Sequence, residues 1–383
     1  MDDGSKAPPT LHDVAREAGV SIATASRALN GSSRNVRSEN ARRVRAAAAK
    51  LDYEPHLSAQ AIAKGSTRTV ALVIRDVADP YFSSIAAGVT RAAEEARLIV
   101  TMAVADGSPE RELEIVRTLR GQRPRVIIVA GSRVAGSGTR DALLEELEEY
   151  RTAGGRVVLI SQRDLPFGTV TIDNHGGARD LARALLDAGY RRFAVFHAPD
   201  EIRTSRERHD GFRTGLREWA LTASGLDPSA APWPEAGAFR LDGSDLVGGV
   251  AEPLAIETAF TRAGGYDAAR RLVERGFEDV EAVFAVNDVM AIGAMVAFRD
   301  AGVIPGVDIG VAGFDDIGSA LDVVPALTSV AVPLQEAGLT AMRLALSDDE
   351  SAPDVPLPTR VVLRESTPPR HGKGRAGRPR DRA

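Results

Sequence analysis

The stretch "TLHDVAREAGVSIATASRALNG" (residues 10–31) contains two short helical patterns separated only by Gly19, Val20 and Ser21. Thr10 and Ser21 belong to the residue types that cap helix N-termini, and glycine is the type that most often ends a helix. Two short helices joined by a three-residue turn with a glycine form a helix-turn-helix. The stretch therefore predicts a small all-α head at the start of the chain.

The second of these helices has an unusual outward face. Ala25, Ala28 and Leu29 fall on the inward side at helical spacing, which leaves small or polar residues and Arg27 outward. Small residues let a helix approach a DNA groove closely, and an arginine can reach guanine or a phosphate. An ordinary α-hairpin with a solvated face is the alternative. A third helix over 39–51, capped by Ser38, would complete a three-helix core.

The segment "YEPHLSAQAIAKGST" (residues 53–67) follows the head. Residues 58–63 suffice for little more than one helical turn, which is too short to persist alone in water. Such a turn would fold only against a partner. In a dimer, two copies could enter the minor groove and wedge Ile62 into a base step. A plain flexible linker is the alternative.

From residue 69 onward the chain alternates between apolar runs and helical stretches. Apolar runs of this length are typical of buried parallel strands, and their alternation with helices predicts doubly wound α/β sheets. There are too many strands for one sheet, so we expect two similar lobes. The first set of expected strands is 70–76, 98–106, 126–131 and 157–161, and the second set is 169–173, 193–198, 254–260, 282–287 and 309–314.

Carboxylate, arginine and aromatic side chains follow several of the expected strands. Ligands of doubly wound folds bind at the carboxyl ends of the strands, which in a two-lobed protein face the cleft between the lobes. Carboxylates and an arginine with flanking aromatic rings suit polyhydroxylated or heterocyclic ligands. The alternative is that Asp288 and Asp315 cap helices while Phe82 and Phe314 pack in the core.

Composition and motifs argue against other classes of protein. The chain has 383 residues, a net charge of −5 and no cysteine, so it has no disulfide and no cysteine-ligated metal. Its six histidines show no metal-ligand spacing, and no P-loop or dinucleotide-binding glycine motif follows a strand. We therefore expect no enzyme activity, no cofactor and no metal. A polar N-terminus without a long apolar run predicts a cytoplasmic protein with no membrane association.

Basic charge is concentrated towards the two ends of the chain. Residues 10–64 carry nine Lys/Arg against five Asp/Glu, and residues 371–383 form a basic, Gly/Pro-rich tail that we expect to be disordered. Within the tail, Gly377-Arg378-Pro379-Arg380 either forms the core of a minor-groove-binding AT hook or matches one by coincidence. The Gly/Pro-rich residues 221–253 are either a surface insertion or a lid that carries Trp233.

The head and hinge, from residue 10 to the closing "AQAIAKGST", resemble the LacI/GalR family of bacterial transcriptional regulators. The body, to about residue 366, resembles the periplasmic-binding-protein-like fold of the same family. The implied domains are a DNA-binding head (8–53), a hinge (54–67), an effector-binding and dimerisation body (68–366) and a tail (367–383). The resemblance implies base reading by Ile22, Ala23 and Arg27, phosphate contacts by Ser21, Thr24, Ser26 and Asn30, and intercalation by Ile62.

The resemblance also implies an effector site in the body. Arg208 stands in "RxxGF", Asn287 in "VND" and Asp315 in "GFDD". Ser161 stands where many family members have aspartate, which predicts a less polar pocket than that of a typical hexose-binding member. The implied effector-binding residues are Tyr81, Phe82, Ser161, Thr204, Arg208, Phe260, Asn287 and Asp315.

The function implied by the resemblance is transcriptional regulation, most often repression. A homodimer would bind a palindromic operator in double-stranded DNA, and a small sugar-like effector between the lobes would switch it. The alternative is a solute- or sugar-binding protein without a regulatory role.

Overall fold

The computed structural model describes residues 9–29, 36–53, 67–132, 134–225, 250–347, 351 and 353–370. The chain divides into a small N-terminal unit, the head, and a larger unit, the body. Asn30, Ile62, Trp233 and the basic tail lie outside the described residues, so the roles predicted for them remain predictions.

The head contains α1 (Leu11–Ala18), α2 (Ile22–Leu29) and α3 (Ser38–Lys50). Thr10 and Asp13 form a reciprocal capping box at the start of α1, and Gly19 ends that helix in the left-handed conformation with φ 62°. The predicted helix-turn-helix is thus confirmed. Its core is built mainly of alanine, which brings the three helices close together: Val14, Ala15, Ala18, Ala25, Ala28, Val44, Ala47 and Ala48.

The third helix begins one residue earlier than predicted. Arg37 occupies the N-cap position without a side-chain hydrogen bond, and Ser38 is the first helical residue rather than the cap. Val44, Ala47 and Ala48 of α3 close the core as expected.

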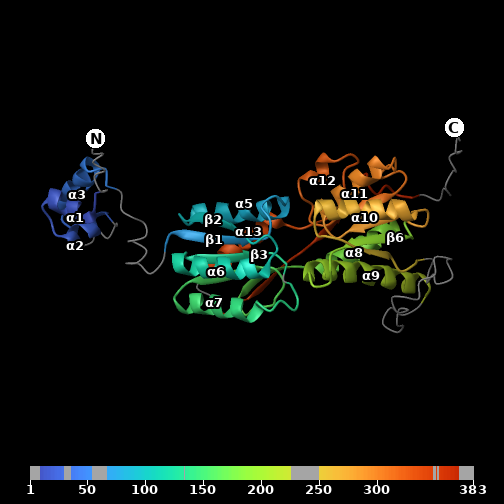
Figure 1. Cartoon of the computed structure of the whole chain (residues 1–383), viewed down its shortest axis with the longest axis horizontal. Helices are drawn as coiled ribbons and strands as arrows, with labels where there is room; N and C mark the ends of the chain where they lie inside the picture. Colours follow the sequence, from blue (N-terminus) through green and yellow to red (C-terminus); the bar gives the residue numbers. More distant parts are fainter. Residues whose placement is uncertain are drawn as a thin grey trace, which may run out of the picture. The chain divides into compact units, whose positions relative to one another are not determined.

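The first lobe of the body is built on a six-stranded sheet with strand order β11-β5-β4-β3-β1-β2. Two helices cover each face of this sheet (Figure 1). The strands are β1 (Thr69–Ile74), β2 (Ile99–Val104), β3 (Val126–Ala130), β4 (Arg156–Ile160), β5 (Gly168–Ile172) and β11 (Asp354–Leu357). The helices are α5 (Pro80–Glu95) and α13 (Leu334–Leu346) on one face, and α6 (Pro109–Gln122) and α7 (Arg140–Thr152) on the other.

Alternating residues of β1 belong to two separate apolar clusters. Val70, Leu72 and Ile74 pack with the α5 and α13 side, whereas Ala71 and Val73 pack with the α6 and α7 side. Because both faces of a central parallel strand are buried, the strand reads in sequence as an unbroken apolar run.

The second lobe has a four-stranded parallel sheet with strand order β7-β6-β8-β9. Helices α8 and α9 pack together on one side of it, and α10 and α11 pack together on the other (Figure 1). The strands are β6 (Phe193–His197), β7 (Leu254–Glu257), β8 (Ala282–Ala285) and β9 (Gly310–Ala312). The helices are α8 (Asn174–Asp187), α9 (Arg203–Ala223), α10 (Arg262–Arg275), α11 (Asp288–Asp300) and the short α12 (Ser319–Asp322).

The prediction that strand 169–173 belongs to the second set was wrong. β5 pairs with β4 in the first sheet, and the chain enters the second lobe only after it, at α8. The chain later returns to the first lobe through α13 and β11. Two short antiparallel strands, β10 (Ser329–Ala331) and β12 (Arg360–Val362), precede and follow that return. The expectation of a helix-turn-helix head and two doubly wound lobes is confirmed.

Helices α5 and α13 approach each other closely through two glycines. A Cβ atom on Gly88 would lie 2.0 Å from the carbonyl oxygen of Gln335, and one on Gly338 would lie 2.2 Å from that of Ile85. The helix that returns from the C-terminal part of the chain can therefore dock on α5 only where both helices lack side chains.

Replacing Gly88 with alanine should destabilise the body by about 1–3 kcal/mol, because the added methyl group would force the two backbones apart. Gly121→Ala is a matched control, since Gly121 also lies in a helix and a Cβ there meets no heavy atom within 4 Å. The control should raise stability by up to about 1 kcal/mol. Urea unfolding of both variants tests this, and an equal effect in both would contradict close packing at Gly88.

Candidate functional site

The outward face of α2 is accessible along its length. Ala25 and Ala28 are buried against α1 and α3, whereas Ser21, Ile22, Ala23 and Arg27 are exposed, and Thr24 and Ser26 are half-buried. The Ser21 hydroxyl accepts a hydrogen bond from the Thr24 backbone N–H at 3.2 Å, which caps the helix. Ile22 keeps 44% of its surface exposed. The face thus offers small side chains, one apolar contact and one cation.

In the body, Arg208 lies at the centre of a cluster of polar side chains. Its own side chain is 98% buried. Its guanidinium donates from Nε to Asn174 Oδ1 (2.9 Å), from Nη1 to the Val286 carbonyl (2.8 Å) and from Nη2 to Asp315 Oδ1 (2.7 Å). The guanidinium carbon also lies 3.8 Å from the centre of the Phe314 ring. One side chain of α9 therefore connects the start of α8 with the carboxyl ends of β8 and β9.

A second set of hydrogen bonds links this arginine to the first lobe. Gln162, just after β4, donates from Nε2 to Thr204 Oγ1 at 2.7 Å and to Glu207 Oε2 at 3.4 Å. The same Glu207 oxygen accepts from Asn174 Nδ2 at 3.0 Å. Together these six residues form the inter-lobe network: Gln162, Asn174, Thr204, Glu207, Arg208 and Asp315.

Further hydrogen bonds, donated by backbone N–H groups, join the two lobes beside this network. The Thr204 N–H donates to Ser132 Oγ at 3.1 Å, and the Ala135 N–H donates to the Glu201 carbonyl at 2.8 Å. Val134 and Ile202 form an isolated β-bridge. The segment that precedes and begins α9 is thus the part of the second lobe that contacts the loop after β3.

Aromatic rings lie beside the polar groups. Tyr81 and Phe82, at the start of α5, form an edge-to-face pair with centroids 4.9 Å apart. Arg75 of the first lobe lies 5.5 Å from the centre of the Phe260 ring of the second lobe. Burial raises the pKa of the Tyr81 phenol, and the nearby Asp315 carboxylate adds to this effect. The Tyr81 hydroxyl therefore remains a hydrogen-bond donor throughout the physiological pH range.

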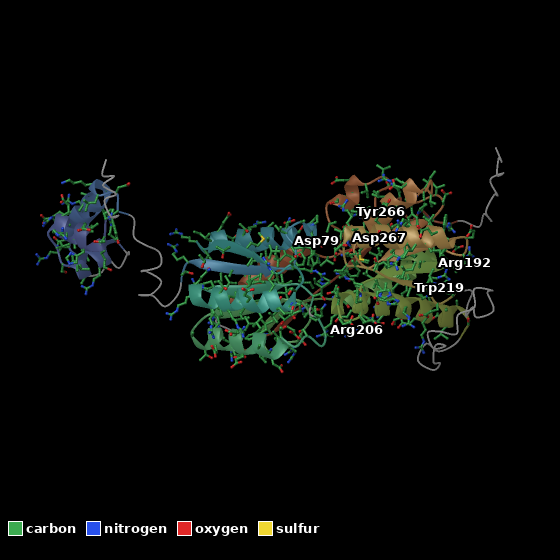
Figure 2. All side chains as sticks on the ribbon, in the orientation of Figure 1. Asp79, Arg192, Arg206, Trp219, Tyr266 and Asp267 are labelled. Carbon is green, nitrogen blue, oxygen red and sulfur yellow. The ribbon has the colours of Figure 1, made fainter. Side chains whose placement is uncertain are left out.

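The carboxyl groups of the cluster are buried as well. Burial raises the pKa of Asp315 to about 7, against the opposing effect of Arg208. Burial also raises the pKa of Asp79, which caps α5 at the end of the first lobe (Figure 2). Asp315 has a φ of 114°, a region that residues other than glycine rarely adopt. Strained backbone of this kind is concentrated at functional sites, where the surrounding structure holds it in place.

Asp288 is completely buried, and no cation among the described residues forms a hydrogen bond with it. It accepts from Ser329 Oγ at 2.6 Å and from the Ile317 N–H at 2.9 Å. Burial raises its pKa well above the usual 3.8, and the nearby Asp315 raises it further. Burial thus disfavours the ionised form of Asp288 relative to the same carboxyl group in water.

The structure brings together most of the effector-binding residues predicted from the sequence. Thr204, Arg208 and Asp315 belong to the inter-lobe network. Tyr81 and Phe82 lie at the start of α5, where Phe82 packs in the hydrophobic core, as the alternative expected. Ser161 hydrogen-bonds to the Gly131 carbonyl at 2.6 Å and to Gln162 Oε1 at 3.2 Å. Phe260 contacts Arg75 rather than the network itself.

Asn287 has a structural role of its own. Its side chain accepts a hydrogen bond from the Met290 N–H at 3.0 Å and caps α11. The alternative interpretation of the sequence assigned a capping role to Asp288 instead. Its predicted contact with an effector remains a prediction.

Sequence reasoning missed Gln162, Asn174 and Glu207. Gln162 and Asn174 follow two neighbouring strands of the first sheet, so the strand-end rule that selected Ser161 could have found them. Glu207 precedes Arg208 on α9, and only the folded chain shows that it accepts from both lobes.

The structure also brings together histidines that are separated in sequence. The rings of His197 and His209 stack with centroids 4.5 Å apart and an interplanar angle of 21°. Burial and the neighbouring His197 lower the pKa of His209 to about 4. The sequence argument against a metal site considered only spacing along the chain and could not detect this pair.

Comparison with known families accounts for both units. Residues 10–56 match the family described as "Bacterial regulatory proteins, lacI family". Residues 67–228 match "Periplasmic binding proteins and sugar binding domain of LacI family", and residues 182–367 match "Periplasmic binding protein-like domain". The HTH-type transcriptional regulator GalS of Salmonella typhimurium is 30% identical over 349 residues, covering 90% of this chain and 92% of GalS. The chain belongs to the LacI family of bacterial regulatory proteins.

Solved structures support the same assignment for this LacI-family regulator. The transcriptional regulator CelR in complex with cellobiose has a TM-score of 0.61 and 28% identity, covering 94% of this chain and 99% of CelR. The Lac repressor dimer bound to operator and the anti-inducer ONPF has a TM-score of 0.72 and 22% identity, covering 94% of this chain and all of that one. These relationships support a transcriptional regulator and do not support the alternative of a solute-binding protein.

No helix in the described part of this LacI-family regulator combines the length and the apolarity that crossing a bilayer requires.

The raised pKa of Asp288 predicts a pH-dependent stability. The folded state binds the proton of the Asp288 carboxyl group more tightly than the unfolded state does. Protonated Asp288 therefore contributes to the free energy of unfolding fully below pH 3.8, and this contribution is lost as the pH rises through the raised pKa. Between pH 5 and pH 8 the wild type should lose more stability than Asp288→Asn, which cannot ionise. The difference should be about 1.4 kcal/mol for each pH unit between pH 5 and the raised pKa. Urea unfolding of both proteins at both pH values tests this, and equal losses would rule out a titrating Asp288.

Proposed function

We propose that this regulator is a cytoplasmic homodimer without enzyme activity that binds a palindromic operator and is switched by a small hydroxyl-rich effector between its lobes. The observation that carries the proposal is the inter-lobe network, in which Gln162 of the first lobe donates to Thr204 and Glu207 of the second, beside the buried Arg208 and Asp315. Sugars present the same alternation of donors and acceptors, so an effector could replace hydrogen bonds that the lobes now make with each other. The CelR–cellobiose complex is one related protein with a bound sugar.

The proposed DNA contact is the outward face of α2. Its exposed residues suit a major groove because small side chains permit close approach and Arg27 can donate two hydrogen bonds to guanine. Ser21, Thr24 and Ser26 would hold phosphates beside Ile22 and Ala23, which would contact bases. Residues 10–64 carry a net positive charge, whereas the body between them and the basic tail is acidic, which favours approach of the head to DNA.

Exposed apolar residues of the body support a dimer. β2 forms an edge of the first sheet, and two of its apolar residues are exposed: Ile99 at 62% and Met102 at 48%. An edge strand with this character is a template for contact with another chain. The Lac repressor, which shares the fold, is a dimer on its operator.

The switch in this proposal is a change in the populations of lobe arrangements. An effector that binds one lobe arrangement more tightly than the other shifts the population towards that arrangement. The shift in free energy equals the difference between its two binding free energies, and the affinity for DNA changes by the same coupling free energy. Because the network and the backbone contacts of residues 201–204 join the lobes directly, they are the groups that such a ligand would rearrange.

Selection of binding sites from random DNA, with purified protein at fixed salt, tests the proposed function first. We expect enrichment of a palindrome with two half-sites. Folded protein that enriches no sequence, with or without a pooled metabolite extract, would contradict the proposal.

Arg27→Ala should weaken binding to the enriched operator by about 10- to 100-fold, because a bidentate arginine contributes about 1–3 kcal/mol of discrimination. Arg270→Ala removes the same charge from an exposed ion pair on α10 and should leave operator affinity unchanged. Fluorescence anisotropy at one salt concentration measures both. Retention of the wild-type preference by Arg27→Ala would exclude Arg27 from base reading.

Thr204→Val should weaken the response to an effector by about tenfold, the effect of one lost hydrogen bond. The measurement is the rise in melting temperature with a panel of free sugars that includes cellobiose and ribose. Thr118→Val, which removes an exposed hydroxyl that donates to the Glu114 carbonyl within α6, is the matched control and should respond as the wild type does. Identical dose responses in both variants would place the effector elsewhere.

A further inference from the structure

His197, Asp200 and His209 form a cluster of potential metal ligands in the second lobe. One ligand atom from each lies within 4.8 Å of the other two. The three residues come from the end of β6, the following loop and α9, so folding alone assembles them. The cluster is separate from the inter-lobe network, although His209 directly follows Arg208 in the chain.

The environment of His197 fixes the chemical state that a metal requires. Its Nδ1 lies 2.9 Å from the Ala198 carbonyl oxygen, and a carbonyl can only accept, so Nδ1 carries the proton. The lone pair is therefore on Nε2. Metal-ligating histidines typically make this bond with the other ring nitrogen, which orients the ring and fixes its tautomer. The His197 side chain is buried, so this orientation is held by packing as well.

The remaining ligands are compatible with a transition metal. A tetrahedral zinc ion about 2.1 Å from each ligand atom requires those atoms roughly 3.4 Å apart. Because the two rings now stack, the His209 ring must rotate away from His197 to direct its lone pair at the ion. Two imidazoles and a carboxylate favour Zn²⁺ or Co²⁺ over Mg²⁺ or Ca²⁺. The neighbouring cation Arg213 forms an ion pair with Glu252, which reduces its repulsion of a bound metal.

We propose that His197, Asp200 and His209 bind one divalent transition metal ion, with a coordination position left for water. The site would fix the loop between β6 and α9. Glu201 and Ile202 in this loop contact Ala135 and Val134 of the first lobe, so a metal held by Asp200 would stabilise the contact between the lobes.

Cobalt titration of the untagged, metal-free, full-length protein tests the site without reference to DNA or effector. We expect visible absorption bands that saturate at one Co²⁺ per chain and disappear when Zn²⁺ is added. Asp200→Asn removes the charge of an exposed loop residue and keeps the shape of its side chain. It should weaken binding at least about tenfold, because even loss of an outer-shell partner has an effect of that size. His209→Gln should abolish the bands.

His175→Gln is the matched control, because His175 is an exposed histidine on α8 and lies outside the cluster. It should bind Co²⁺ as the wild type does. Zn²⁺ should also raise the melting temperature of the wild type and of His175→Gln, but not of Asp200→Asn. Absence of saturable bands in the wild type, or equal affinity in Asp200→Asn and the wild type, would overturn the proposal.

Discussion

The buried guanidinium of Arg208 is the interaction on which the arrangement of the second lobe depends. A charge removed from water needs partners for its donors, and three separate segments provide them: Asn174, the Val286 carbonyl and Asp315. Loss of a buried partner of this kind typically costs about 3–5 kcal/mol. The strand ends that hold these partners are therefore fixed relative to α9. The same constraint explains why Asp315 is held in a backbone conformation that is otherwise rare.

Small residues have a comparable role where helices meet. In the head, an alanine core lets three short helices pack closely. The inward side of α2 needs only small side chains there, and its other face remains outward. In the body, Gly88 and Gly338 let α13 dock on α5 although hundreds of residues separate them in the chain. Close approach without side chains thus supports both the exposed face of the head and the return of the chain to the first lobe.

Much of the fold could be predicted because its signals are local. Thr10, Gly19 and Ser21 mark helix ends by their own backbone and capping chemistry, and the nine apolar runs correspond to β1–β9. Arg208 and Asp315 were identified through short motifs and are in direct contact. Asp288 was less predictable, because its burial without a cation depends on Ser329 and Ile317, which lie far along the chain. The strands β10–β12 mix apolar residues with Ser, Asp, Pro or Arg, so no continuous apolar run marks them.

By itself, the sequence determined the helix-turn-helix, the alternation of strands and helices and the residue types available at the strand ends. These follow from periodicity and capping, which act over a few residues. Only the tertiary structure decided that β5 and β11 complete the first sheet, that Gln162 and Glu207 join the lobes, and that His197 stacks on His209. Pairings between distant segments depend on which surfaces pack together, and the sequence pattern within each segment is the same whichever partner it meets.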